Sequence, residues 1–123
     1  MIHREENEAW VYYRRNDKEI LDEHKCGKWM YFFRHKFEKA DYLCKKAVSD
    51  DICCSAKHSN DEDGVCCFYL NIDDIERHQK VLQFFLDNHL IPRNKDGNLQ
   101  NIPFKLDDQT SAGEYGKSFH AKL

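Results

Sequence analysis

The adjacent pair Lys57-His58 is the first place in the sequence where anion binding or acid–base chemistry could occur. The pair could hold a phosphate, or His58 could act as acid and Lys57 as base in an elimination. Neighbouring side chains on a strand point to opposite faces of a sheet, however, which would separate the two groups. The alternative is a solvated strand end whose charges complement the acidic turn at residues 61–63.

Residues 104–116 have the most unusual composition in the chain, combining small and hydroxyl-bearing side chains with glycine. Backbone N–H groups in such a loop can form a nest for an anion, and the hydroxyls of Thr110 and Ser111 can reach phosphate or ribose oxygens. Arg93 and Asn94 could add a cation and an amide that contacts a base. The alternative is a plain surface loop.

Phe84 lies in a segment that we expect to be helical from Asp73, its N-cap, with Glu76 completing a capping box, to the residues before Pro92. At about 100° per residue, Phe84 falls nearly opposite the predicted apolar face, so we expect it to be exposed. An exposed Phe serves as a subunit contact, as a stacking surface for a base, or as an isolated surface residue. The predicted buried face consists of Ile75, His78, Leu82, Phe85, Leu86 and His89.

Cysteine occurs six times, and we expect these residues to be reduced and packed in the core, since unpaired Cys is among the most buried residue types. Adjacent cysteines on a strand point to opposite faces and do not easily share one metal, although zinc or redox roles remain alternatives. We expect no metal and no cofactor. The six positions are Cys26, Cys44, Cys53, Cys54, Cys66 and Cys67.

The predicted elements form one domain over residues 1–123. Strands are expected at 9–14, 28–34, 52–57, 65–70 and 99–106, with helices over 36–48 and from 73 onward. In the first helix one apolar face is expected, with Tyr42 on the other; its residues are Phe37, Ala40, Cys44, Ala47 and Val48. The order is one strand followed by a β-α-β-β-α-β unit. We therefore predict an α+β fold: a ferredoxin-like antiparallel sheet with two main helices on one face and an extra N-terminal strand. The uncovered face would be available to a ligand or another subunit.

The charge balance limits the classes of partner. The chain has 19 basic and 22 acidic residues, a net charge of -3, which argues against a groove for DNA or RNA. A small anionic ligand remains possible, because one pocket needs only a few cations. No apolar run approaches the roughly 20 residues of a membrane span, and no basic-then-apolar leader is seen, so we expect a cytoplasmic protein without a membrane partner.

Five segments together resemble the phage family of Thoeris anti-defence proteins, type one. The resemblance spans nearly the whole chain. The segments are WVYY at 10–13, GKWMYFF at 27–33, AKHSN at 56–60, GVCCFYLN at 64–71 and FKLDDQTSAGEYG at 104–116.

This resemblance implies binding without catalysis. Such proteins sequester the cyclic ADP-ribose isomers that a host TIR enzyme makes during infection, in pockets between protomers of a homo-oligomer, a dimer or hexamer. By the resemblance, Phe84 stacks on adenine, Asn94 supplies an amide contact, and Gln109 and Thr110 match the loop motif. Ser111 stands where the family pattern has an arginine. The resemblance also suggests a second pocket, for a cyclic di- or trinucleotide, with Ala112 and Gly113 in it and Lys57 as a cation for either pocket.

Two other classes stay open. A phosphothreonine lyase would need a lysine base and a histidine acid around one phosphate, which the adjacent placement of Lys57 and His58 disfavours. A protein-inhibitor or oligomerisation module would use exposed aromatic residues without any small ligand.

Overall fold

The computed structural model describes residues 2–15, 21–22, 24–107 and 119–121. These residues form an α+β structure in which two helices pack on a seven-stranded sheet, and every neighbouring pair of strands is antiparallel. The strand order is β1-β2-β4-β5-β3-β6-β7. The bounds are β1 Ile2–Glu6, β2 Trp10–Arg15, β3 Cys26–Phe33, α1 Phe37–Ser49, β4 Ser55–Ser59, β5 Gly64–Asn71, α2 Ile75–Asp87, β6 Ile102–Leu106 and β7 Phe119–Ala121.

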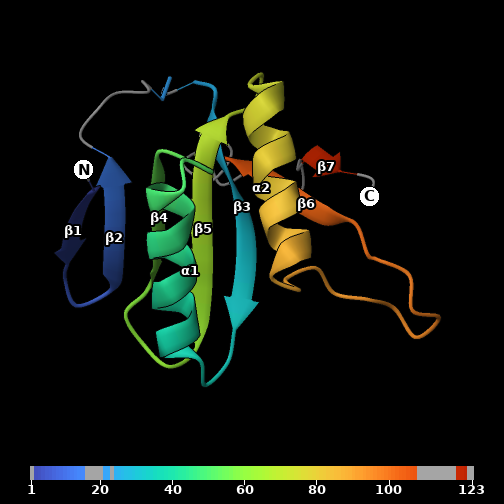
Figure 1. The fold of residues 1–123 in the computed structure, drawn as a ribbon, viewed down its shortest axis with the longest axis horizontal. Helices are drawn as coiled ribbons and strands as arrows, with labels where there is room; N and C mark the ends of the chain where they lie inside the picture. Colours follow the sequence, from blue (N-terminus) through green and yellow to red (C-terminus); the bar gives the residue numbers. More distant parts are fainter. Residues whose placement is uncertain (1, 16–20, 23, 108–118, 122–123) are drawn as a thin grey trace.

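Both helices cover the same face of the sheet, with α1 in front of β4 and β5 and α2 alongside β3 and in front of β6 (Figure 1). We call this the helix-covered face and the opposite one the open face. The largest fully buried rings lie under the helices, where Phe68 of β5 is 5.3 Å from Phe85 and Trp29 of β3 is 5.3 Å from Phe104 of β6, centroid to centroid. The alternation of strand side chains therefore places every second residue of β3, β4 and β5 in the core and the others on the open face.

The predicted buried face of α1 is confirmed. Ala40, Cys44, Ala47 and Val48 are buried together with Leu43, and the side chain of Tyr42 is 57% exposed on the outer surface of the helix. Helical spacing of small apolar residues was sufficient to identify this face because it has no competing apolar stripe.

The predicted buried face of α2 is wrong in part. Phe84, expected on the surface, is only 5% exposed, and its ring centroid lies 5.9 Å from that of Phe68. Ile75, expected in the core, is 63% exposed. Packing against the β5 rings rotates the helix so that the buried residues are His78, Val81, Phe84 and Phe85.

The N-cap of α2 is Asp74 and not Asp73. A side-chain oxygen of Asp74 accepts a hydrogen bond from the backbone N–H of Arg77, which satisfies one of the amides that a helix leaves unpaired at its start. The carboxylate of Asp73 instead pairs with Lys25 at 2.8 Å. Tertiary contacts thus decided which of two adjacent aspartates caps the helix.

All six cysteines are buried, as expected, and none forms a disulfide. The adjacent pair on β5 divides between the two faces: Cys66 Sγ lies 4.0 Å from the carbonyl of Ala40 on α1, whereas Cys67 lies near Lys28 and Lys57 on the open face. This strand thus places one cysteine side chain on each face of the sheet.

The two helices have 13 residues each, and within the described ranges no helix has the length and apolarity needed to cross a bilayer.

Candidate ligand-binding site

Lys57 and His58, adjacent on β4, point to opposite faces of the sheet. His58 is fully buried on the helix-covered face, where its Nε2 lies 2.9 Å from Asp41 Oδ1 of α1 and its Nδ1 lies 2.9 Å from the carbonyl oxygen of Ser59. Lys57 lies on the open face, over the ring of Trp10. The two side chains therefore do not share one space in which both could act on a single phosphate.

A cavity of about 240 Å³, which we call the open-face hollow, contains Lys57. Strand register creates it: Tyr12 of β2 pairs with Lys57, and Ser55 of β4 pairs with Tyr69 of β5. Its lining residues are Tyr12, Arg14, Leu21, Cys26, Ser55, Lys57, Tyr69 and Asp107.

Aromatic rings and cations alternate around this hollow. Lys57 Nζ lies 3.8 Å from the ring centroid of Trp10, 5.8 Å from that of Tyr12 and 5.9 Å from that of Tyr69. The guanidinium carbon of Arg14 is 4.6 Å from the Tyr12 ring, and Lys28 Nζ is 5.7 Å from the Tyr69 ring. Ring faces attract cations, so the rings hold the positive groups in defined positions.

The charges of the hollow are unequally neutralised. Lys28 Nζ pairs with Asp107 Oδ1 at 3.0 Å, and Arg14 lies 3.7 Å from Glu5. Within the described part of the chain, Lys57 Nζ has no carboxylate oxygen within ion-pair distance. Burial lowers the pKa of Lys57, and the nearby positive charges of Lys28 and Arg14 add to that effect.

Two cysteines and one tyrosine in or beside the hollow are shifted toward their neutral forms. Burial, followed by the charge of Asp107, raises the pKa of the Cys26 thiol to about 12. Burial also raises the pKa of Cys67 to about 11 and raises that of Tyr69 well above its usual range. Lys57 thus becomes easier to deprotonate, while the thiols and the phenol remain protonated at neutral pH.

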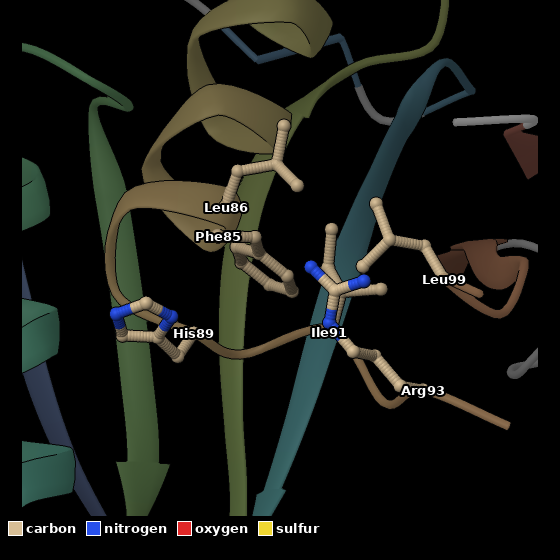
Figure 2. A pocket seen from close by; sticks show the side chains of 6 residues that line it. All are labelled: Phe85, Leu86, His89, Ile91, Arg93 and Leu99. Atoms are coloured by element: carbon tan, nitrogen blue, oxygen red, sulfur yellow. The ribbon is translucent and has the colours of Figure 1, made fainter. Parts of the chain in front are cut away.

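A second cavity, of about 200 Å³, lies at the C-terminal end of α2 and is called the α2 hollow (Figure 2). Arg93 is on its wall and donates from Nη1 to the carbonyl oxygen of Gly97 at 2.7 Å. Its other lining residues are Phe85, Leu86, His89, Ile91 and Leu99, so apolar side chains and two polar ones, Arg93 and His89, share its wall.

The side chain of Asn94, beside the α2 hollow, stabilises a turn. Its side-chain carbonyl oxygen accepts hydrogen bonds from the backbone N–H groups of Asp96 and Asn98, each at 3.0 Å. These bonds form a local turn of the kind that Asn side chains favour. The Oδ1 of the amide that was predicted to contact a ligand is therefore already hydrogen-bonded within the chain.

The predicted site residues thus separate. Lys57 lines the open-face hollow, Arg93 lines the α2 hollow, and Asn94 holds the turn next to it. Phe84, predicted to stack on a base, is a core residue between α2 and β5 because its ring packs on Phe68. The remaining predicted positions, Gln109, Thr110, Ala112 and Gly113, lie outside the described residues.

The sequence analysis did not single out Trp10, Tyr12, Arg14, Lys28 or Tyr69, although together they make most of the open-face hollow's binding groups. A signal was present in β2, where Trp10, Tyr12 and Arg14 alternate with the buried Val11 and Tyr13. The pairing of β2 with β4, which brings this row to Lys57, is not visible in the sequence.

In the described part of the chain no cluster of three or more His, Cys, Asp or Glu side chains could hold a metal ion. No protein-family model matches the chain, and no curated protein matches it in sequence.

The geometry of the open-face hollow is suited to an anionic ligand with a planar ring. Cations that are partly held by aromatic faces can pair with a phosphate, while the aromatic rings of the hollow stack on the planar ring of the ligand.

Proposed function

We propose that this chain binds and sequesters a cyclic ADP-ribose-type signalling nucleotide without cleaving it. The observation that carries the proposal is the open-face hollow, which Lys57 and Arg14 line together with the rings of Tyr12 and Tyr69, with the Trp10 ring against Lys57. A nucleotide has the two features that this arrangement would recognise, a phosphate for the cations and a base for the rings.

Each group has a distinct role in the proposed complex. The Lys57 ammonium and the Arg14 guanidinium pair with pyrophosphate oxygens, and Arg14 can do so with two parallel hydrogen bonds. The ring of Tyr12 or Tyr69 stacks on adenine. The carboxylate of Asp107, held by Lys28 at 3.0 Å, accepts hydrogen bonds from ribose hydroxyls.

The size of the hollow supports a shared site. At about 240 Å³ it is smaller than the roughly 300–1,000 Å³ of typical small-molecule pockets, so it would enclose only part of a cyclic dinucleotide-sized ligand. A second protomer would complete the enclosure, in a dimer or hexamer.

The fold fits this proposal. We propose a ferredoxin-like sandwich, which is supported by the strand order β4-β5-β3-β6 with α1 after β3 and α2 after β5, and in which β1 and β2 extend the sheet beyond β4. In the biological setting that we propose, the protein acts in the cytoplasm of an infected bacterial cell and blocks TIR-based immunity for a phage.

The experiment mixes the purified protein with a cyclic ADP-ribose isomer, removes unbound ligand, and then denatures the protein by heat. Recovery of intact nucleotide supports sequestration. Recovery of a cleaved nucleotide would show an enzyme, and no retention by the folded protein would reject the proposal.

The site is tested with a double variant, Arg14→Ala with Lys57→Ala. A charge-assisted hydrogen bond contributes about 1.5–3 kcal/mol, so losing both cations should weaken binding at least tenfold, to an extent measured by calorimetric titration. Lys46→Ala is the matched control, because Lys46 lies on α1 and pairs with Asp50. Equal affinity in the double variant and the control would exclude the open-face hollow as the site.

The lyase alternative predicts dehydrobutyrine from a phosphothreonine peptide. The opposite orientation of Lys57 and His58 argues against it, because acid and base must reach the same substrate.

A further inference from the structure

Lys57 differs from the other described lysines in its surroundings. Its Nζ lies 3.8 Å above the Trp10 ring in a hollow, with two further rings within 6 Å of it. Lys25 and Lys46, by contrast, each pair with an aspartate at 2.8 Å on the surface. Those carboxylates raise the pKa of both lysines, whereas burial lowers that of Lys57.

An amine must lose its proton before it can act as a nucleophile. Proteins activate lysines in two ways, by removing them from water and by placing another cation nearby. Lys57 has both: burial in the hollow lowers its pKa most, and the charges of Lys28 and Arg14 lower it further, while Cys67 and Asp107 act in the opposite direction. The Trp10 ring favours the ammonium form but also fixes the position of Nζ. The titratable and charged groups that face it are Arg14, Lys28, Cys67, Tyr69 and Asp107.

We propose that Lys57 is a nucleophilic amine that captures a phosphorylated aldehyde in the open-face hollow as a reversible imine. The Nζ lone pair attacks the carbonyl carbon and forms a C–N bond, giving a carbinolamine. Loss of water then breaks the original C–O bond and forms the C=N bond. The carbonyl oxygen leaves with the two amine protons, so no oxidant or reductant is needed.

The hollow selects the class of aldehyde. Arg14, which reaches over Tyr12 into the same space, can pair with a phosphate while the aldehyde carbon meets Lys57. Tyr12 and Tyr69 offer ring faces to a planar or sugar body between the two ends. Open-chain sugar phosphates and phosphorylated aromatic aldehydes have this combination of groups.

The test uses pyridoxal 5′-phosphate with cyanoborohydride at neutral pH, followed by peptide mass spectrometry. We expect Lys57 to be reduced to a stable secondary amine at least about fivefold faster than Lys25 or Lys46, because a larger fraction of it is unprotonated. Pyridoxal, which lacks the phosphate, should label Lys57 more slowly. Equal labelling across the surface lysines, or no phosphate preference, would overturn the proposal.

The inference shares the hollow with the proposed function but does not depend on it. Lys57→Arg keeps the positive charge and removes the nucleophile, so it should abolish the adduct. Lys46→Arg is the control and should leave the adduct on Lys57 in place. If the wild-type protein forms the Lys57 adduct but does not retain the nucleotide, only sequestration is contradicted. If it retains the nucleotide but forms no adduct, only imine formation is contradicted.

Discussion

The two faces of the sheet use polar side chains in opposite ways. On the helix-covered face they are hydrogen-bonded to one another, and among the described residues no buried side-chain nitrogen or oxygen lacks a partner. On the open face, Lys57 and Arg14 lie over aromatic rings at the wall of a cavity. The difference indicates that polar groups stabilise the fold on one face and remain available to a ligand on the other.

The helix-covered face contains a chain of hydrogen bonds that joins four elements. Arg4 Nε of β1 donates to the Tyr13 hydroxyl of β2 at 3.1 Å, and that hydroxyl donates to Asp41 Oδ1 of α1 at 2.8 Å. The same oxygen is 2.9 Å from His58 Nε2 of β4. Both ring nitrogens of His58 therefore face oxygen atoms, Asp41 Oδ1 on one side and the carbonyl oxygen of Ser59 on the other.

The largest contrast between the faces is expected for two phenylalanines on the neighbouring strands β5 and β3. Phe68→Ala should lower the free energy of unfolding by about 3–5 kcal/mol, because it leaves a cavity beneath Phe84 and Phe85. Phe32→Ala, at a residue 70% exposed on the open face, should change it by less than about 0.5 kcal/mol. Chemical denaturation measures both, and similar losses would contradict the assignment of faces.

A smaller effect is expected at Asp41. Asp41→Ala removes the acceptor shared by Tyr13 and His58 and should cost about 1.5–3 kcal/mol of unfolding free energy. Asp50→Ala on the same helix breaks only the surface pair with Lys46 and should cost less than about 1 kcal/mol. If denaturation midpoints show the two variants to be equal, the buried network has no special role in stability.

The smallest effect concerns His78, which links α2 to β3. The Trp29 Nε1–H donates to His78 Nδ1 at 3.0 Å, so the His78 proton lies on Nε2, which donates to the carbonyl of Ile72 at 2.8 Å. Burial lowers the pKa of His78 below its ordinary 6.5, so the unfolded chain takes up the proton first as pH falls. The stability contributed by neutral His78 is therefore complete above pH 6.5 and decreases as the pH falls below that value.

Melting temperatures between pH 8 and pH 5 test this, with His78→Gln as the comparison. The variant should lose part of the decrease in melting temperature that the wild type shows at acidic pH. An identical pH dependence in both proteins would show that His78 does not contribute to it.

Helical periodicity predicted α1 correctly but not the rotation of α2. In α1, small residues such as Ala40 and Ala47 define a single apolar face. In α2, Phe84 and Phe85 are adjacent, so the pattern allows either of them to lie at the centre of the buried face. Both are buried, because both rings pack on Phe68. Adjacent large apolar residues leave the rotation of a helix open until the surface that it packs against is known.

The candidate site, too, could be predicted from the sequence only in part. Alternation along β2 and β4 was enough to predict that Lys57 and His58 face opposite sides, since successive strand residues always do. The register of β2 with β4, which brings Tyr12 beside Lys57, depends on pairing between segments about 45 residues apart. Arg93, which was grouped with Lys57 in the prediction, lines a different cavity.

The sequence alone therefore determined the types of the elements from β2 to β6, the burial of the cysteines and the division of side chains between the two faces of each strand, because these depend on local periodicity; β1 and β7 were not predicted. Tertiary structure decided which strands are neighbours, which helix residues are buried and which cations share a cavity, because each of these depends on contacts between distant segments. The open-face hollow belongs to the second group. Its cations and rings come from β2, β3, β4 and β5, and only strand pairing places them around one space.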